Sequence, residues 1–252
     1  MAEHKKTALV TGASSGLGAE FCRQLATRCG TVIAVARRAD RLRELARELG
    51  GQADVHCLAA DLTSIEGVHA TLEVLRQRGP VDYLVNNAGF GTSGHFDTLP
   101  LDGQRSMVAL HIDASLSLCR GAIPFMRERG GGAIINVSSL GSWMPGAGLA
   151  VYGATKAFLN CFSIALQAEL IDAGIEVQAL CPGFTRTGFH DAMSGHGFER
   201  DQIPPEMWME PAAVVAASLS ALGSGRVLVI PGEGNVALAR AALEKQLADL
   251  DG

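Results

Sequence analysis

The stretch that decides the fold is TALVTGASSGLG, residues 7–18, close to the start of the 252-residue chain. Its first five residues form an apolar, β-branched run typical of a buried strand, and helical periodicity begins directly after the turn. Glycines at Gly12, Gly16 and Gly18 let the backbone approach a bound group closely, and the helix N-terminus offers free N–H groups to an anion such as a pyrophosphate. The spacing differs from the common G-x-G-x-x-G fingerprint, so a plain tight connection between strand and helix is the alternative interpretation.

Beyond this turn, short apolar runs alternate with segments of helical period. This alternation predicts an α/β fold: a doubly wound (Rossmann) seven-stranded parallel sheet with helices on both faces, in a single domain covering residues 1–252. The expected strands are 7–11, 31–36, 55–59, 83–86, 133–138, 176–181 and 227–230. The expected helices are 16–28, 41–49, 64–78, 102–126, 150–173 and 211–222. The irregular stretch 183–210 is far longer than an ordinary connection, which favours a substrate-binding loop or lid.

Composition excludes several classes of protein. Hydrophobic residues make up 48% and charged residues 19% of the chain, which is typical of a compact globule and not of a disordered chain. A net charge of −5 argues against a nucleic-acid partner. The start is too short for a signal-peptide core and no 18-residue apolar run occurs, so we expect no membrane partner and a cytoplasmic location. Six cysteines without a CxxC pair predict buried, reduced thiols, and the histidine spacings predict no metal site.

Four motifs, of which the opening turn is the first, occur along the chain in a characteristic order. TGASSGLG at 11–18, Asp61 after the third expected strand, NNAG at 86–89 and Tyr152-x3-Lys156 resemble the short-chain dehydrogenase/reductase (SDR) family over nearly the whole chain. The resemblance implies an oxidoreductase that interconverts a carbonyl and a secondary alcohol by hydride transfer with NAD(H) or NADP(H). By the same resemblance, Asp61 contacts the adenine, and Asn86 and Gly89 shape the end of the fourth strand beside the cofactor.

The end of the second expected strand bears on the choice of cofactor. An NAD-preferring enzyme places a carboxylate there for the ribose 2′-hydroxyl, whereas this chain reads Val35, Ala36, Arg37, Arg38. Since arginine holds a 2′-phosphate well, we expect NADP(H), with NAD(H) less favoured. A solvated arginine pair is the alternative. The expected cofactor-binding residues are Gly12, Ser14, Ser15, Gly16, Leu17, Gly18, Arg37, Arg38, Asp61, Leu62, Asn87, Ala88, Gly89, Tyr152, Lys156, Pro182, Gly183, Thr185 and Thr187.

The expected catalytic residues lie in the second half of the chain. Tyr152 and Lys156 are four apart on a helical segment, so they share one face. A neighbouring ammonium is expected to lower the pKa of the tyrosine from its ordinary value of about 10. The resemblance assigns proton transfer to Tyr152, support of the tyrosine and contact with the ribose to Lys156, and binding of the substrate oxygen to Ser139, with Ser138 as the alternative serine.

His111 departs from the family pattern. Many relatives place an asparagine here that holds a water linked to the lysine, but MVALH aligns His111 with that position. Three interpretations stay open: the histidine replaces the asparagine in the proton relay, it merely packs, or the protein is a weakened or non-catalytic relative. A dinucleotide-binding sensor without turnover is therefore the main competing function, and an epimerase or dehydratase using transient oxidation is a third.

The segment after the sixth expected strand bears on the substrate. It is rich in adaptable and aromatic side chains, which favours a bulky apolar carbonyl or alcohol, although the same residues could cover the core or an interface. These residues are Phe189, Met193, Phe198, Met207, Trp208 and Met209. A helical stripe of Phe158, Phe162, Leu166 and Leu170, together with the family resemblance, predicts a homodimer or homotetramer.

Overall fold

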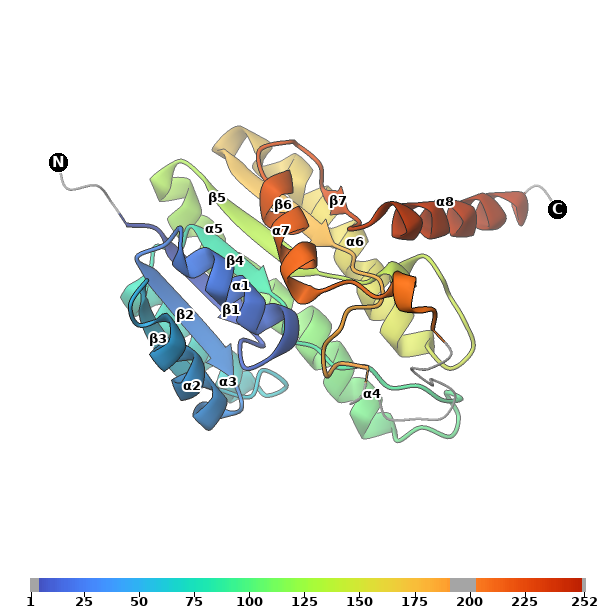
Figure 1. The fold of residues 1–252 in the computed structure, drawn as a ribbon, viewed down its shortest axis with the longest axis horizontal. Coiled ribbons are helices and arrows are strands. Elements are labelled where there is room, and N and C mark those ends of the chain that lie inside the picture. The colour runs from blue at the N-terminus through green and yellow to red at the C-terminus, as the bar shows by residue number, and fades with distance from the viewer. Residues whose placement is uncertain (1–4, 191–202, 251–252) are drawn as a thin grey trace.

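The computed structural model, which describes residues 5–190 and 203–250, is built on a single parallel sheet (Figure 1). Its strand order is β3-β2-β1-β4-β5-β6-β7, and every neighbouring pair is parallel. The strands are β1 (Thr7–Thr11), β2 (Thr31–Ala36), β3 (Asp54–Ala59), β4 (Tyr83–Asn86), β5 (Gly132–Val137), β6 (Ile175–Leu180) and β7 (Leu228–Val229). The predicted seven-stranded doubly wound sheet is confirmed.

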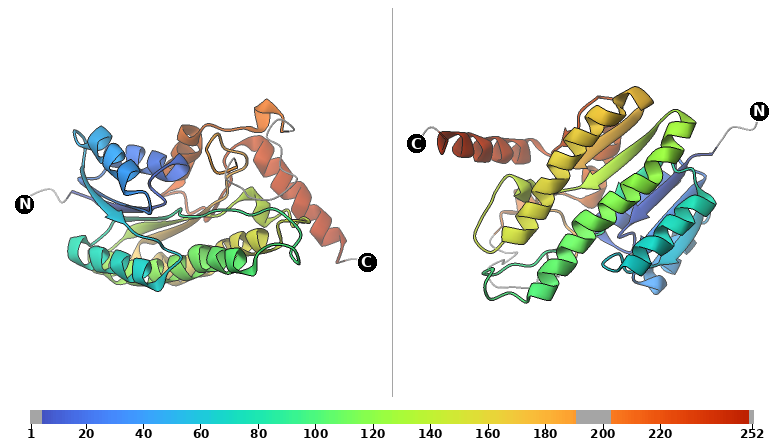
Figure 2. Two further views of the ribbon diagram at one scale, coloured as in Figure 1. Left: turned by 90° about the horizontal axis from the view of Figure 1, so that it is seen from below. Right: turned by 180° about the vertical axis from the view of Figure 1, so that it is seen from behind.

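Helices cover both faces of the sheet, as the two additional views show (Figure 2). One core cluster packs α1, α2 and α7 on the sheet, and the other packs α3, α5 and α6 on the opposite face. This sandwich follows from parallel pairing, because each return to the next parallel strand must cross a face of the sheet. The helices are α1 (Gly16–Ala26), α2 (Ala39–Leu49), α3 (Ile65–Arg78), α4 (Leu101–Val108), α5 (Ala114–Arg129), α6 (Ala150–Leu170), α7 (Pro211–Ala221) and α8 (Glu233–Ala248).

The strand order reverses between β1 and β4, and this reversal determines where a ligand can bind. The helices that follow β1 and β4 leave toward opposite faces, which opens a crevice at the carboxyl ends of these two strands. The glycine turn follows β1 and the NNAG segment follows β4, so both border this crevice. β4 has β1 on one side and β5 on the other. Ser139 lies two residues after the end of β5.

Two helical predictions need correction. The expected continuous helix 102–126 is divided into α4 and α5 by a π-helical turn, Ala109–Asp113. The C-terminal helix α8 was not expected, and Figure 1 shows that it extends away from the sheet. Its last turns are exposed, so α8 lacks the buried stripe by which sequence periodicity reveals a surface helix.

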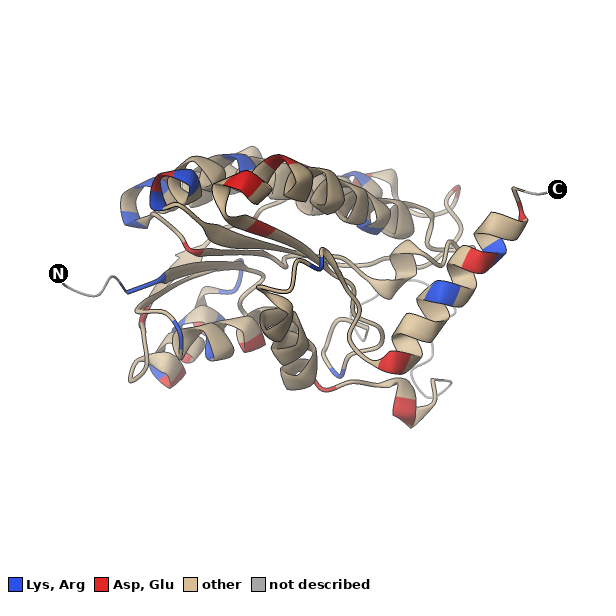
Figure 3. Ribbon diagram, turned by 90° about the horizontal axis from the view of Figure 1, so that it is seen from above, with Lys and Arg blue, Asp and Glu red and all other residues tan. Residues whose placement is uncertain are grey.

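In the view of Figure 3, acidic and basic residues lie mainly on the helices, and the two signs are mixed. Within residues 5–190 and 203–250, no helix is long and apolar enough to cross a membrane. The same residues contain no group of three or more metal-ligating side chains. All six cysteines are free and four are buried, whereas Cys57 is partly buried and Cys161 is exposed.

Candidate active site

The glycine turn after β1 leaves space where side chains would otherwise stand. Gly12 has φ +67°, and a Cβ on it would lie 2.7 Å from Asn87 Nδ2 and 2.9 Å from Ala88 Cα. Helix α1 begins at Gly16, its N-cap Ser15 makes no side-chain capping bond, and its first turn holds no acid. Backbone N–H groups at the positive end of the helix dipole therefore face the crevice, an arrangement that fits a pyrophosphate.

Thr11 joins the glycine turn to the NNAG segment. Its hydroxyl donates to the Val85 carbonyl over 3.2 Å and accepts from the backbone N–H groups of Asn87 and Ala88 over 2.9 and 3.0 Å. The Asn87 side-chain amide returns a bond of 2.9 Å to the Thr11 carbonyl. Sequence reasoning did not identify Thr11 as a site residue, because its role depends on how β4 pairs with β1.

The side-chain amide of Asn86 is buried between the sheet and the helices α5 and α6. It donates to Asn136 Oδ1 over 2.8 Å, and Asn136 in turn donates to Ser163 Oγ over 2.9 Å. These buried bonds link β4, β5 and α6 beneath the end of β4. Asn86 therefore holds the strand end from below, in line with the role expected from the resemblance.

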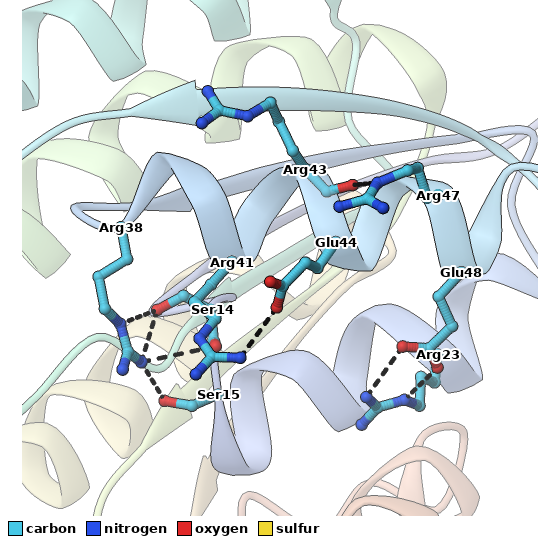
Figure 4. Close-up of polar contacts among 9 residues, drawn as sticks. All are labelled: Ser14, Ser15, Arg23, Arg38, Arg41, Arg43, Glu44, Arg47 and Glu48. Carbon is cyan, nitrogen blue, oxygen red and sulfur yellow. Dashed lines mark hydrogen bonds and ion pairs between the residues drawn. The ribbon is translucent and has the colours of Figure 1, made fainter.

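Arg38 and the two serines of the glycine turn form a polar group at the N-terminus of α1 (Figure 4). Arg38 Nη2 donates to Ser15 Oγ over 2.7 Å and to Ser14 Oγ over 3.0 Å, and Nε lies 3.2 Å from Ser14 Oγ. We refer to Arg38, Ser14 and Ser15 as the arginine–serine cluster. It combines a guanidinium fork with two hydroxyl donors, the set of groups that binds a phosphate monoester.

Asp61 and Leu62 occupy the adjoining end of β3. The Asp61 carboxylate accepts from the backbone N–H of Thr63 over 3.0 Å and from its hydroxyl over 2.8 Å. These bonds, led by the one from the backbone, lower the pKa of Asp61, and the nearby charge of Arg37 acts in the same direction. Leu62 is buried beneath this turn. An ionised, exposed Asp61 beside the crevice suits contact with an amino group such as that of adenine.

Tyr152 and Lys156 lie on the first turns of α6, and both are at least nine-tenths buried. Ser139 precedes the short 3₁₀ turn Leu140–Ser142, where its Oγ accepts from the Gly141 N–H over 3.1 Å. Burial raises the pKa of Tyr152, and a hydrogen bond with Ser139 opposes that rise. The phenol is therefore protonated at neutral pH and adjoins the serine expected to bind a substrate oxygen.

The expectation that Lys156 lowers the pKa of Tyr152 is wrong for this geometry. The Lys156 ammonium donates to the Val137 carbonyl over 2.8 Å and lies 5.9 Å from the centre of the Tyr152 ring. Burial lowers the pKa of Lys156 to about 8, so the amine still carries its charge through most of the neutral range. Desolvation of the phenol outweighs any Coulomb effect of this more distant ammonium.

The choice between the two serines follows from the direction of their side chains. The Ser138 hydroxyl donates to the backbone carbonyl of Lys156 over 2.8 Å, so it is used to hold α6 against β5. Ser139 instead lies beside Tyr152, since a Cβ on Gly141 would lie 3.4 Å from Ser139 Oγ and 3.6 Å from Tyr152 Cε1. The geometry thus favours Ser139, the serine preferred from spacing.

His111 lies in the π-helical turn, with its ring centre 6.2 Å from that of Tyr152 and 6.2 Å from that of Phe90. It is 1% exposed, and it bonds Thr155 and the backbone of Phe90. Gly89 lies directly against its ring, since a Cβ on Gly89 would lie 2.8 Å from His111 Nε2. The structure thus brings His111 to the site, and it adds Phe90 and Thr155, which sequence reasoning did not single out.

The segment after β6 lies against the glycine turn. Thr187 packs against the glycine turn, because a Cβ on Gly16 would lie 3.3 Å from Thr187 Cβ. Thr185 is buried and its hydroxyl bonds the Gly183 carbonyl over 3.1 Å, so Thr187 is the better placed of the two threonines. Gly183 packs against Asn235, and the Pro182 carbonyl accepts from the Leu140 N–H over 2.8 Å.

The segment after β6 also carries aromatic side chains, and one of them lies next to Tyr152. The ring centre of Phe189 lies 6.1 Å from that of Tyr152, and those of Phe184 and Trp208 lie 5.4 Å apart. An ion pair between Arg186 and Glu210, at 3.1 Å, joins the two described ends of the expected loop 183–210. Met193 and Phe198, which were expected to line it, lie outside the described residues.

Comparison with known proteins gives a consistent result. The family profile described as short chain dehydrogenase matches residues 6–196. A short-chain dehydrogenase from Sphingobium yanoikuyae, solved in complex with NADPH, is 34% identical with a TM-score of 0.85, over 97% of this chain and 94% of that one. The bulky-bulky ketone specific alcohol dehydrogenase from Comamonas testosteroni is 29% identical with a TM-score of 0.80, over 96% and 94% of the two chains.

Among curated sequences, serine 3-dehydrogenase from Rhizobium radiobacter is 36% identical over 185 residues, which are 73% of this chain and 73% of that protein. The family profile spans the glycine turn, the NNAG segment, Ser139, Tyr152 and Lys156, which follow β1, β4 and β5 or lie at the start of α6. On sequence, fold and arrangement of the site, the chain belongs to the short-chain dehydrogenase/reductase family of NAD(P)-using oxidoreductases.

Proposed function

We propose that this protein is an NADP(H)-dependent oxidoreductase that interconverts a bulky apolar ketone or aldehyde with the corresponding alcohol. The observation that carries the proposal is the buried Tyr152 phenol, which lies beside Ser139 next to Gly141 and one helical turn from Lys156. A nicotinamide cofactor supplies the hydride, or receives it, at the substrate carbon when it is bound.

Three residues of the chain have separate roles in the proposed reaction. Ser139 holds the substrate oxygen by a hydrogen bond, and Tyr152 gives a proton to that oxygen during reduction or takes it during oxidation. Because its pKa is raised, Tyr152 carries its proton at neutral pH, which is the form needed for reduction. Lys156 keeps a positive charge beneath the site and is placed to contact a ribose, as the family resemblance implies.

The arginine–serine cluster supports the preference for NADP(H). Arg38 already points at Ser14 and Ser15, so the three side chains need little rearrangement to enclose a 2′-phosphate. Asp40, the nearest acid that follows Arg38 in the sequence, lies within α2 and not at the end of β2, where a ribose 2′-hydroxyl would require it. The NADPH bound to the Sphingobium relative supports the same preference.

The aromatic side chains beside Tyr152 support the proposed substrate class. Phe189 packs against Tyr152, and the ring of His190 joins Phe189 to Phe184 and Trp208, so that aromatic rings form a wall beside the tyrosine. Such a wall gains free energy by removing apolar substrate area from water, at roughly 25 cal/mol per Å². The Comamonas relative is described as specific for bulky-bulky ketones, which is in line with this proposal.

We also propose that the protein is a homodimer or homotetramer. The sequence stripe expected to join subunits needs correction, because Leu166 and Leu170 pack in the chain's own core. A different face of α6 is exposed and consists of small and apolar side chains. Its members are Ala154, Ala157, Cys161, Ile164 and Ala168. Their spacing of three and four residues forms one straight stripe that fits the same helix of a second copy.

The direct test is turnover. Purified protein with NADPH is mixed with a panel running from acetone to aryl ketones and aldehydes, while the absorbance of the reduced nicotinamide is followed. We expect faster consumption with the aryl ketones than with acetone. NADPH binding without turnover across the panel would support the dinucleotide-binding sensor and overturn the proposed enzyme.

A further inference from the structure

The π-helical turn between α4 and α5 places His111 at a junction of the site. Its ring lies between Phe90, which follows the NNAG segment, and Tyr152 on α6. Turns of this kind inside a helix are often found at functional sites, because the extra residue redirects a side chain. The family resemblance leads to an asparagine here, so the histidine is a feature of this chain that the proposed function leaves unexplained.

Both ring nitrogens of His111 have partners. Nδ1 lies 2.9 Å from Thr155 Oγ1, and Nε2 accepts from the backbone N–H of Phe90 over 3.3 Å. The Thr155 hydroxyl has one proton, which it donates to the Tyr152 backbone carbonyl over 2.9 Å. Its oxygen must then accept from Nδ1–H, because no second proton is available for donation.

The two partners specify the same protonation state independently. Thr155 requires a proton on Nδ1, and the Phe90 N–H, which can only donate, requires Nε2 to be bare. The imidazolium form would point Nε2–H at the Phe90 N–H and lose that bond. Gly89 keeps the space open, because a Cβ there would lie 2.8 Å from Nε2.

Electrostatics acts in the same direction as this geometry. The titratable groups that face His111 are Tyr152 and Lys156, both from α6. Burial and the positive charge of Lys156 lower the pKa of His111 well below 6.5. The ring is therefore neutral at the pH where a solvent-linked histidine would exchange protons.

We propose that His111 is a positioning residue: as the neutral Nδ1–H tautomer it ties the turn of α6 that carries Tyr152 and Lys156 to the backbone after the NNAG segment, and it carries no proton for the reaction. This inference rests on the proposed function for its meaning, since the two segments that it joins bear the proposed catalytic and cofactor-binding residues. The sequence left three interpretations of His111 open. The proposal corresponds to the second, in which the histidine packs, and adds that this packing holds the two segments together.

The decisive measurement is the tautomer of His111 in the full-length protein. Two-bond ¹H–¹⁵N correlation spectra of ¹⁵N-histidine-labelled protein distinguish the two nitrogens, and the spectrum of His111→Gln identifies the signal. We expect Nδ1 protonated and Nε2 bare, unchanged over about one pH unit on either side of 6.5. A proton on Nε2, or titration within that range, would overturn the proposal. This readout needs no turnover, so it is independent of whether the proposed reaction is correct.

Kinetics with matched variants tests the positioning role. Thr155→Val removes the acceptor for Nδ1–H and keeps the shape of the side chain, whereas Thr155→Ser keeps the hydroxyl. We expect Thr155→Val and His111→Gln to lower kcat by between about fivefold and a hundredfold, and Thr155→Ser to stay within about threefold of the parent. The pH at which kcat is half-maximal should be unchanged in all three. A shifted pH profile in His111→Gln would instead assign the histidine to the proton relay and contradict the proposal.

Discussion

Replacing Arg38 by alanine should impair the use of NADPH and spare the use of NADH. Arg38 Nε and Nη2 donate hydrogen bonds to the hydroxyls of Ser14 and Ser15. A bound 2′-phosphate would accept hydrogen bonds from the same two nitrogens. A hydrogen bond to a charged group contributes about 1.5–3 kcal/mol. Because Arg38 is exposed, water screens the pair, and we count one such bond rather than two.

That free energy corresponds to a loss of about 10- to 150-fold in kcat/KM for NADPH, at about 1.4 kcal/mol per factor of ten. NADH lacks the phosphate, so its kcat/KM should change by less than about threefold. The assay measures initial rates with both cofactors at a fixed concentration of the best substrate from the panel.

Arg41→Ala is the matched control. Arg41 lies three residues further along, and it pairs with Glu44 at 2.9 Å instead of contacting the serines (Figure 4). Its loss should leave both cofactors within about twofold, as expected for an exposed ion pair. If Arg38→Ala lowered kcat/KM for NADPH and NADH by the same factor, or left NADPH unchanged, the reasoning from the arginine–serine cluster would be refuted.

Three further changes have defined outcomes. Ser139→Ala should lower kcat by about a hundredfold, whereas Ser138→Ala should mainly lower stability, by about 1 kcal/mol; equal kcat losses in the two would contradict the assignment. Because the pKa of His111 lies below its unfolded value of 6.5, the unfolded chain takes up a proton first as pH falls through 6.5. The free energy of unfolding should then decrease by up to about 1.4 kcal/mol per pH unit, and urea titrations of His111→Gln should lack this contribution. Ile164→Glu should reduce the mass in light scattering toward that of one chain, and an unchanged mass would exclude the α6 stripe as the interface.

The central strands could be predicted from sequence to the residue. β1, β2 and β4 are continuous apolar runs bounded by turn residues, and in a parallel sheet both faces of such runs are buried, so the pattern has one interpretation. β7 was predicted two residues too long because its apolar run, 227–230, continues past the two residues that pair with β6. Helix α8 escaped prediction because most of its length is exposed and it lacks a buried apolar stripe.

The residues of the candidate site were expected from the sequence, but their connections were not. The family motifs pointed to Tyr152, Lys156 and Ser139, whose separations along the chain match the family pattern. The contacts of His111 with Thr155 and Phe90 join residues that are far apart in the sequence, so they could not be expected from it. Likewise, the bond from the Lys156 ammonium to Val137 requires β5 and α6 to be packed together, so the effect of the lysine on Tyr152 could not be read from a four-residue spacing.

The two tyrosines of the chain allow the proposed chemistry to be tested with an internal control. Tyr152→Phe removes the buried phenolic proton, while Tyr83→Phe removes the only other phenol, which lies on β4 beside Lys6. The measurement is the single-turnover rate of NADPH oxidation with the best substrate, alongside the NADPH dissociation constant. We predict that Tyr152→Phe slows this rate by about 10²- to 10⁴-fold with NADPH binding nearly unchanged, and that Tyr83→Phe leaves the rate as in the parent. A Tyr152→Phe variant that reduces its substrate at the parental rate would contradict proton transfer by this residue.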